Sequence, residues 1–526
     1  MSFASPHPDV DIPEVPVHRF LFGTFEDGHL DKPALIDDPT SSIVTYRRLL
    51  DEIEAVAGAL AGRGLGSGDV VAIHAPNSPS FAVVLHGVLR AGGTATTINV
   101  LYTAGDIAAQ LRDASAKFLV TVDALLPQAR SAAHLVGMAV ERVIVLDGAP
   151  GHPSLRELLD QRLSAPDVVI DPRTHTAVLP YSSGTTGRPK GVMLTHHNLV
   201  ANVCQIAKPT GIRDSDRILA VLPFFHIYGL TALLNAALYH RATLVTMPRF
   251  DLADFLGAIE RHRCTYLLIA PPVALALAKD PSVDLHDLSS VHTICSGAAP
   301  LDGALAQAVA TRLACRVYQG YGMSELSPVS HTVGVDEDAP ADSVGRPVAN
   351  TVNKIVDPET GIEVALPENG RSAPGELWVK GPNVMAGYLG NEAETRATID
   401  AEGFLHTGDI AVVDSDSTIY IVDRLKELIK YKGYQVPPAE LEAVLLGHPM
   451  ITDAAVIGVP TEAGEVPKAF VVRGHGAELS EDAVMSFVAD RVSPHKKVRQ
   501  VEFIEAIPKS AAGKILRKDL RALHRG

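Results

Sequence analysis

Short apolar runs alternate with helical patterns over most of this chain. The run VVAIHA at 70–75 precedes the helical stretch SPSFAVVLHGVLRAG, and KFLVTV at 117–122 precedes a stretch rich in alanine and leucine. Such alternation is typical of strands joined by helices, so it predicts largely parallel sheets covered by helices. The sequence has no repeat with a period of 20–50 residues, which excludes a solenoid.

The pattern changes near residue 340. Strand-like pieces such as GELWVKG and STIYIVDR follow, separated by glycine, proline and aspartate turns, and they predict a β-rich subdomain over roughly 340–423. After Asp423 come a charged segment, a helix announced by two prolines, two strands and another helix. We therefore predict an α/β fold with a large N-terminal domain, residues 1–423, and a small α+β C-terminal domain, residues 424–526.

Charge and cysteine usage restrict the partners. The 526 residues include 46 lysines and arginines against 61 aspartates and glutamates, a net charge of −15. This field repels phosphate polymers and anionic lipid, so we expect no nucleic-acid partner. The four cysteines lie too far apart for a zinc or redox motif, so we expect reduced, structural thiols. They are Cys204, Cys264, Cys295 and Cys315.

Targeting signals are also missing from the pattern. The N-terminus mixes acids and prolines instead of a basic start and an apolar run, and no stretch approaches roughly 18 uninterrupted apolar residues. The C-terminal LHRG matches no common address signal. A cytoplasmic protein without integral membrane association is the expectation.

The most informative segment is YSSGTTGRPKGVMLTHHNL at 181–199. Its glycines allow close approach of backbone N–H groups, and its hydroxyls and one lysine add donors and a cation, a set suited to a polyphosphate. These residues are Ser182, Ser183, Gly184, Thr185, Thr186, Gly187 and Lys190. The alternative is a flexible linker. A kinase-type G-x-x-x-x-G-K loop is excluded because Pro189 stands where the second glycine is required.

Further segments carry chemistry at fixed places. In QGYGMSE, 319–325, Tyr321 offers a ring to stack on a base and Glu325 a hard oxygen ligand for Mg²⁺. In GFLHTGD, 403–409, Asp409 has a carboxylate that can accept both hydroxyls of a ribose. In VLPFFHIYGL, 221–230, His226 taken by itself favours a buried core histidine. Each residue alone has a plain alternative, a solvated turn or simple packing.

Together these motifs resemble the adenylate-forming superfamily, which includes acyl-CoA synthetases, aryl-CoA ligases, beetle luciferases and peptide-synthetase adenylation domains. The resemblance extends in family order to PKSAAGK at 508–514 and covers essentially the whole chain. Within the superfamily, FFHIYGL, GYGMSE and ELIKYKGYQVPPAELE look most like the 4-coumarate and acyl-CoA ligase branch. The resemblance implies a small C-terminal domain that moves about a hinge at Lys426.

The resemblance also assigns roles to residues. It implies that Lys514, His226, Lys430, Gln435 and Lys426 serve catalysis, and that Glu325 and Thr185 bind the metal. It implies nucleotide or CoA contacts beyond the loop for Gly297, Ala298, Ala299, Gly320, Tyr321, Gly322, Ser324, Asp409, Arg424, Lys432 and Gly433. The acyl pocket is expected to involve Tyr228, Gly229, Gly297, Gly322, Pro328 and Val329.

The implied activity is an ATP-dependent acid–CoA ligase that uses Mg²⁺ and forms an acyl-adenylate. The acid is a fatty acid or an aryl or cinnamic acid, and Leu326, where plant enzymes have a smaller residue, weakens the case for a cinnamate. One alternative is an adenylating enzyme that stops at acyl-AMP or loads a carrier protein in trans. Another is a nucleotide-binding protein without turnover, against which the intact charged residues argue.

Overall fold

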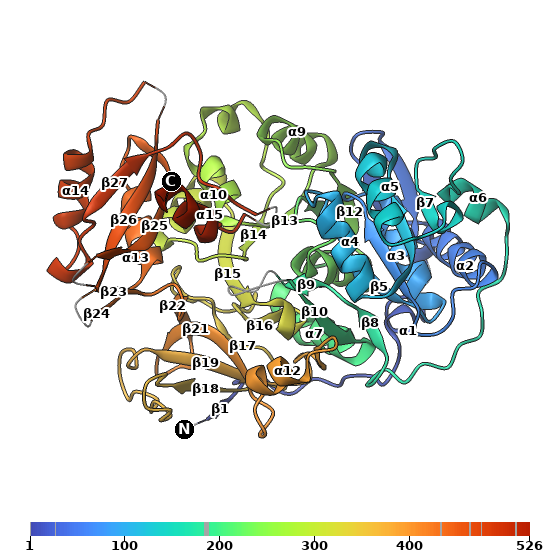
Figure 1. The fold of residues 1–526 in the computed structure, drawn as a ribbon, viewed down its shortest axis with the longest axis horizontal. Helices are drawn as coiled ribbons and strands as arrows, with labels where there is room; N and C mark the ends of the chain where they lie inside the picture. The colour runs from blue at the N-terminus through green and yellow to red at the C-terminus, as the bar shows by residue number, and fades with distance from the viewer. Residues whose placement is uncertain are drawn as a thin grey trace.

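The computed structural model describes residues 2–26, 28–182, 189–431, 434–461, 464–474, 476–510 and 513–525. The strands of these ranges form four sheets (Figure 1). Two large, mainly parallel sheets come from the N-terminal part, a smaller antiparallel sheet follows, and the C-terminal part has a sheet of its own. None of the helices in the described ranges combines the length and the apolar character needed to cross a bilayer.

The first large sheet has the strand order β20-β10-β8-β5-β4-β6-β7, with β9 paired to β10. Its parallel strands are β4 (Val70–His74), β5 (Thr94–Thr97), β6 (Ala116–Thr121), β7 (Val143–Val145) and β8 (Thr176–Val178). The helices α3 (Pro79–Arg90), α4 (Ala104–Asp113) and α5 (Leu126–Leu135) connect them. The predicted strand–helix alternation is confirmed in this region.

The second large sheet has the order β17-β16-β15-β14-β13-β11-β12-β2-β3. Its parallel centre consists of β2 (Pro33–Asp37), β12 (Thr243–Thr246), β11 (Arg217–Ala220), β13 (Tyr266–Ile269), β14 (Thr293–Ser296) and β15 (Arg316–Gly322). Antiparallel strands β3 (Ser42–Thr45), β16 (Val329–Thr332) and β17 (Arg346–Pro347) complete its edges. The helices around it include α9 (Leu252–His262), α10 (Pro271–Lys279) and α11 (Gly303–Leu313).

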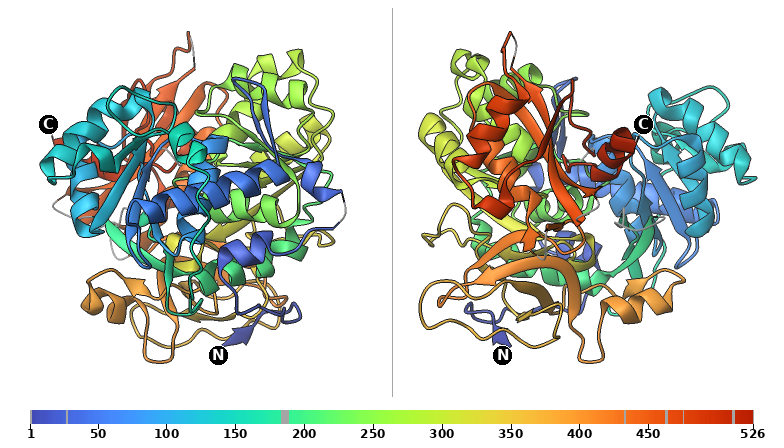
Figure 2. Two further views of the ribbon diagram at one scale, coloured as in Figure 1. Left: turned by 90° about the vertical axis from the view of Figure 1, so that its right-hand side faces the viewer. Right: turned by 60° about the vertical axis from the view of Figure 1, so that its left-hand side comes forward.

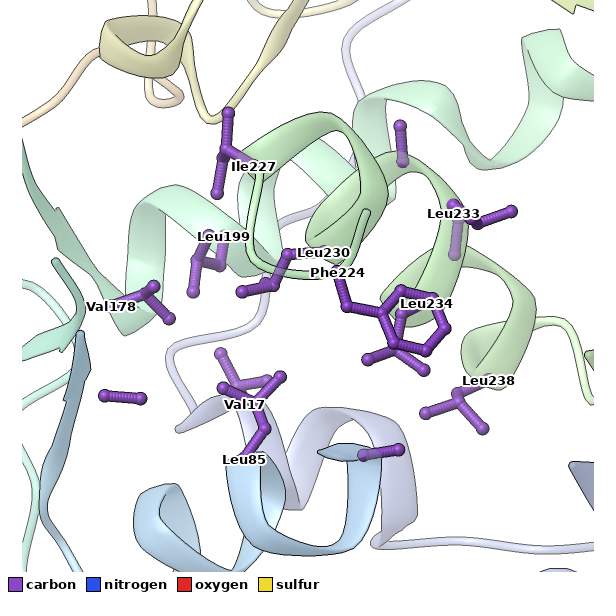
Figure 3. Packing of buried hydrophobic residues seen from close by; sticks show 14 of the residues in the cluster. Val17, Leu85, Val178, Leu199, Phe224, Ile227, Leu230, Leu233, Leu234 and Leu238 are labelled. Atoms are coloured by element: carbon purple, nitrogen blue, oxygen red, sulfur yellow. The ribbon is translucent and has the colours of Figure 1, made fainter. Parts of the chain in front are cut away.

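Helices from distant parts of the sequence pack between the two large sheets. Figure 3 shows side chains of this core, among them Val17, Leu85, Leu199, Phe224 and Leu234, all at most 2% exposed. They come from α1 (Val17–Phe22), α3, α7 (His196–Thr210), the loop before the π-helix η4 (Tyr228–Asn235) and η4 itself. Burying one such side chain contributes about 1.5–3 kcal/mol, so this cluster fixes η4 relative to the sheets.

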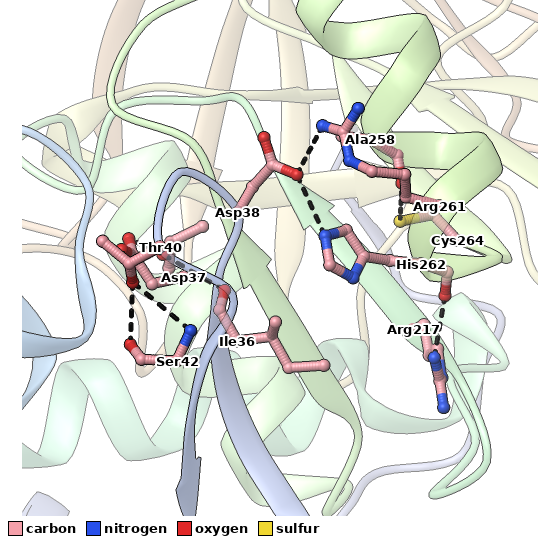
Figure 4. Close-up of polar contacts among 11 residues, drawn as sticks. Ile36, Asp37, Asp38, Thr40, Ser42, Arg217, Ala258, Arg261, His262 and Cys264 are labelled. Carbon is pink, nitrogen blue, oxygen red and sulfur yellow. Dashed lines mark hydrogen bonds and ion pairs between the residues drawn. The ribbon is translucent and has the colours of Figure 1, made fainter.

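A polar contact links the chain after β2 to the helix α9 beside the same sheet. Asp38, directly after β2, accepts a 2.7 Å hydrogen bond from Arg261 and contacts the ring nitrogen Nε2 of His262 at 2.9 Å (Figure 4). Both partners belong to the last turn of α9. The chain after β2 is thereby held against the end of α9, the helix that follows the neighbouring strand β12.

The strands of the predicted β-rich subdomain are divided among three sheets. Four strands of this region form an antiparallel sheet: β18 (Val352–Val356), β19 (Gly375–Lys380), β21 (Leu405–Val413) and β22 (Ile419–Arg424). However, β17 belongs to the second large sheet and β20 (Gly387–Tyr388) to the first, while β1 (Phe3–Ala4) joins this sheet from the N-terminus. Sequence proximity cannot reveal pairing of this kind.

The C-terminal part follows the predicted α+β pattern and lies at one end of the molecule (Figures 1 and 2). Its sheet has the order β24-β23-β26-β25, with β27 paired to β26. The strands are β23 (Ile429–Tyr431), β24 (Tyr434–Val436), β25 (Ile451–Thr461), β26 (Gly464–Arg473) and β27 (Gln500–Phe503), with helices α13 (Pro438–Leu446), α14 (Glu481–Ala489) and α15 (Arg517–Arg525). Lys279 of α10 donates 2.9 Å to the Leu446 carbonyl and thus connects the two parts.

Candidate functional site

One pocket opens at the carboxyl ends of the parallel strands β14 and β15, the edge where open α/β sheets bind ligands. Its walls come from α7, η4, β13 to β16 and the C-terminal tail. The lining residues are Ile206, Thr210, His226, Ile227, Tyr228, Ala232, Leu268, Cys295, Gly297, Ala298, Tyr318, Gly320, Tyr321, Gly322, Met323, Ser324, Pro328, Val329, Thr332 and Lys514.

Asp409 joins Tyr321 to Arg424. The Tyr321 hydroxyl donates a 2.6 Å hydrogen bond to Oδ2 of Asp409, and Nε of Arg424 lies 3.5 Å from Oδ1. Arg424 is opposite Asp409 in the β21–β22 register, so the sheet itself aligns this pair. Burial raises the pKa of Asp409, while Arg424 and Tyr321 oppose the rise. A carboxylate with two such donors is held in one orientation.

Lys514 reaches the pocket from the small part of the chain. The turn that carries it is closed by a 2.8 Å bond from the Ser510 N–H to the Lys514 carbonyl. Gly513 has φ of +80° and lies so close to the loop before α10 that a Cβ there would be 3.2 Å from Cβ of Ala270. Burial first, then Arg424, lowers the pKa of Lys514 to about 8, although Asp409 and Glu325 favour its charged form.

His226 stays neutral at physiological pH. Burial and the nearby Lys514 lower its pKa to about 3. Its Nδ1 accepts a 3.3 Å hydrogen bond from the Tyr228 backbone N–H, which leaves the ring proton on Nε2. The imidazole therefore offers a neutral N–H donor at the pocket wall.

Glu325 is 5% exposed and accepts a 2.9 Å hydrogen bond from the Tyr388 hydroxyl through Oε1. Within the described ranges no cluster of three or more potential metal-binding side chains occurs. Magnesium in nucleotide enzymes is usually held by one or two carboxylates together with substrate phosphates. A single buried carboxylate fits that mode, and Thr185, the other predicted ligand, lies outside the described residues.

The glycine-rich loop is described at its two ends. Ser182 ends β9 (Tyr181–Ser182) and Lys190 begins β10 (Lys190–Thr195), and these two residues pair across the strands. Ser183, Gly184, Thr185, Thr186 and Gly187 lie outside the described residues. After the loop, the Thr195 hydroxyl accepts from the Asn198 N–H in a capping box at the start of α7.

Two residues predicted for the site are not among the lining residues of this pocket. Gly229 does not line the pocket; a Cβ on it would be 2.1 Å from the Pro223 carbonyl oxygen, so the glycine allows η4 to pack on its own preceding loop. Ala299 does not line the pocket either. By contrast, Gly297, Ala298, Gly320, Gly322, Ser324, Pro328, Val329 and Tyr228 all line it.

Sequence reasoning missed Cys295 and Tyr318. Each stands two residues before a glycine that the sequence analysis assigned to the site. These glycines are Gly297, directly after β14, and Gly320, on β15. Side chains two residues apart on a strand share a face, so strand alternation was the signal that could have found them. The Tyr228 hydroxyl lies 3.8 Å from Sγ of Cys295, and the hydroxyls of Tyr318 and Tyr266 are 2.6 Å apart.

The remaining predicted catalytic residues lie elsewhere in the small part. Lys430 and Gln435 face each other in the β23–β24 hairpin, where Gln435 contacts Glu359 at 3.4 Å. Lys426 is exposed between β22 and β23. None of the three lines the pocket, so the structure does not bring them to Lys514. Lys432 and Gly433 lie outside the described residues.

Residues 24–389 match the family described as AMP-binding enzyme, and residues 440–514 match the AMP-binding enzyme C-terminal domain. The chain belongs to the AMP-binding enzyme family. It is 42% identical to 4-coumarate–CoA ligase 1 of Solanum tuberosum over 99% of this chain and 96% of the relative. The 4-coumarate:CoA ligase 1 of Petunia hybrida is also 42% identical, with the same coverage. This AMP-binding enzyme is thus an acid–thiol ligase of the AMP-forming type.

Solved structures support the same fold for this AMP-binding enzyme. ATP-bound MatB from Rhodopseudomonas palustris has a TM-score of 0.87 at 28% identity and covers 97% of this chain and 99% of its own. The anthranilate CoA ligase AuaEII with anthranoyl-AMP has a TM-score of 0.89 at 27% identity, with 98% of both chains covered. The structure of apo MatB has a lower TM-score of 0.77. The fold of this chain is therefore more similar to the ATP-bound arrangement of MatB than to its apo arrangement.

Proposed function

We propose that this enzyme joins a carboxylic acid to ATP as an acyl-adenylate and then transfers the acyl group to coenzyme A. The observation that carries the proposal is the position of Lys514. Although it comes from the last thirteen residues of the chain, it lines the same pocket as His226, Gly297 and Tyr321, with Asp409 and Glu325 near enough to favour its charged form. Related enzymes named as CoA ligases support the assignment.

In the first step a carboxylate oxygen attacks the α-phosphorus of ATP, the bond to the β-phosphate breaks, and pyrophosphate leaves. Both reactants are anions, so a cation in the pocket is needed to bring them together. We assign that role to Lys514, which with a pKa of about 8 is mostly protonated at neutral pH. The neutral Nε2–H of His226 offers a second donor to the acid or to the α-phosphate.

We assign the nucleotide to the Tyr321 side of the pocket. There the ring of Tyr321 would stack on adenine, while Asp409, oriented by Tyr321 and Arg424, accepts the ribose hydroxyls. Glu325 would hold Mg²⁺, which when bound neutralises charge on the phosphates. In the second step the CoA thiol attacks the acyl carbon and AMP leaves. Because Lys430 and Gln435 lie away from the pocket, we infer that the small domain turns about Lys426 before this step.

The pocket supports an aryl acid more than a long-chain fatty acid. Tyr318 lies three residues before Tyr321 on β15, about 10 Å deeper into the sheet. Tyr266 donates to the Thr210 carbonyl at 3.1 Å, so Tyr318 donates to Tyr266. We infer that these bonded rings close the inner end of the pocket, because Tyr318 lines it and both tyrosines are buried. We propose that the site takes one aromatic ring with a short carboxylate-bearing arm, as benzoic and cinnamic acids have.

The test is ATP-dependent release of pyrophosphate and AMP with a panel of benzoic, cinnamic and straight-chain acids, with and without CoA. We expect turnover with aryl acids and formation of the CoA thioester, identified by mass. Release of pyrophosphate with no thioester would favour the alternative of acyl-AMP formation or loading of a carrier protein. Turnover with long-chain acids alone would contradict the substrate class, and no pyrophosphate with any acid would contradict the activity.

A further inference from the structure

Lys190, at the start of β10, has an internal carboxylate partner. Its Nζ forms an ion pair with Oε1 of Glu394 on α12 (Glu392–Thr398) and lies 4.9 Å from the centroid of the Tyr388 ring. The Lys190 side chain is 22% exposed and that of Glu394 is 41% exposed. The pair is therefore near the surface but shielded on one side by an aromatic ring.

The backbone brings these residues together. Strand β20 runs antiparallel to β10 with Val192 opposite Tyr388, and the Leu389 N–H donates to the Gly191 carbonyl at 2.8 Å. Helix α12 follows at once, and its N-cap Asn391 accepts from the Glu394 N–H at 3.1 Å. Glu394 thus occupies the first turn of a helix whose start is fastened beside the strand that leaves the glycine-rich loop.

The same segment also contacts the proposed magnesium ligand. The Tyr388 hydroxyl that donates to Glu325 belongs to the ring that faces Lys190. The other acid of this helix turn, Glu392, instead pairs with Arg396 on the exposed side, at 3.2 Å. Glu394 is therefore the carboxylate of α12 that faces the cation predicted to hold polyphosphate.

A lysine ammonium is a compact point charge with three donors, and an anion that binds to it must share or replace the anions already present. The β- and γ-phosphates of ATP carry the same sign of charge as Glu394. When these phosphates approach Lys190, the nearby charge of Glu394 neutralises part of the lysine's attraction for them. The glutamate also repels them directly. AMP has neither phosphate and is spared both effects.

We propose that Glu394 is an internal competitor of the triphosphate for Lys190 and thereby weakens binding of ATP and pyrophosphate, but not of AMP. This inference rests on the proposed function, in which Lys190 contacts polyphosphate. By forming its ion pair with Lys190 again, Glu394 also favours departure of pyrophosphate once the adenylate has formed. Glu394 is thus a residue that tunes nucleotide affinity through Lys190 rather than one that touches the reacting atoms.

The test compares Glu394→Gln with the native enzyme and with Glu392→Gln, a matched control that removes one charge from the same helix turn. Calorimetry measures the dissociation constants of ATP with Mg²⁺, of inorganic pyrophosphate and of AMP. Because partly exposed ion pairs are weak, we expect Glu394→Gln to bind ATP and pyrophosphate roughly two- to fivefold more tightly. AMP binding should be unchanged, and Glu392→Gln should match the native enzyme throughout.

Unchanged or weaker ATP binding by Glu394→Gln would overturn the inference, and so would an equal gain for AMP, because the effect would then not arise at the β- and γ-phosphates. Lys190→Ala distinguishes competition by Glu394 from the phosphate role of Lys190 itself. If it weakens ATP binding but Glu394→Gln has no effect, competition is wrong and the phosphate role of Lys190 stands. If it leaves ATP binding intact, the phosphate role itself is wrong.

Discussion

The hydroxyl of Tyr321 donates a 2.6 Å hydrogen bond to Asp409, 88 residues further along the chain. This bond connects strand β15 of the second large sheet with strand β21 of the antiparallel sheet β18-β19-β21-β22. It also gives two separately predicted nucleotide contacts a common geometry, because the ring that would stack on the base orients the carboxylate that would bind the ribose. Its energetic weight can be measured directly.

Tyr321→Phe keeps the ring and removes the donor to Asp409. Because one hydrogen bond contributes about 1 kcal/mol and more when the acceptor is charged, we expect the KM for ATP to rise about fivefold to tenfold. Steady-state kinetics at saturating acid measure it. Tyr420→Phe is the matched control, since it removes a 3.1 Å hydroxyl–carboxylate bond to Asp414 away from the pocket. Equal effects of the two substitutions would count against the nucleotide contact.

Lys514→Ala should reduce the rate of adenylate formation by a factor on the order of 10²–10³, the usual loss for one well-placed charged donor. Thioester formation from acyl-adenylate supplied in advance should be nearly unaffected, because the lysine acts in the first step only. Rapid-quench assays of the two half-reactions measure this difference. Lys518→Ala, an exposed lysine of the same tail, is the control. Equal loss in both half-reactions would refute the assignment.

The rate of adenylation should decline above about pH 8. Burial lowers the pKa of Lys514 to about 8, so the side chain is charged below this pH and loses its charge as pH rises through it. The rate should therefore fall by half near pH 8 and about tenfold per further unit. Lys514→Arg stays charged in this range and should lack the decline, whatever its absolute rate. A decline that persists in Lys514→Arg would assign it to another group.

Lys426→Pro should slow thioester formation and leave adenylation intact. The backbone N–H of Lys426 has no acceptor among the described residues, whereas those of Leu425 and Glu427 donate to Gly408 and Arg424. Proline therefore breaks no hydrogen bond here but fixes φ at the proposed hinge. Lys426→Ala removes the charge while keeping backbone freedom, and it should behave like the native enzyme. Normal thioester formation by Lys426→Pro would contradict the hinge.

Gly297→Ala should raise the KM for the acid more than the KM for ATP. A Cβ at this position would lie 2.9 Å from the Tyr228 ring, so the ring must shift, and both residues line the pocket. Michaelis constants for a benzoic and a cinnamic acid measure the change. Gly105→Ala is the control, because its Cβ would meet only an ordinary contact at 3.7 Å. An unchanged KM for both acids would place the acyl group elsewhere.

Part of this protein followed from local sequence. The strand β4, the helix α3 and the cap at Thr195 each depend on residues within one element, where apolar periodicity and side-chain capping are visible in the chain itself. The chemistry of the motifs was equally local. Glycines with hydroxyls and a lysine indicate an anion site at 182–190 wherever the loop is placed.

The tertiary structure alone decided which residues share a pocket and which have partners. That Tyr318 and Cys295 line one pocket with Lys514, and that Lys190 is paired with Glu394, both depend on contacts between segments distant in sequence. Such contacts depend on how sheets and helices pack, and a residue's type fixes its chemistry but not its neighbours. The pKa of Lys514 is lowered from the ordinary lysine value for the same reason, because the side chain is buried in the folded protein and the sequence does not record burial.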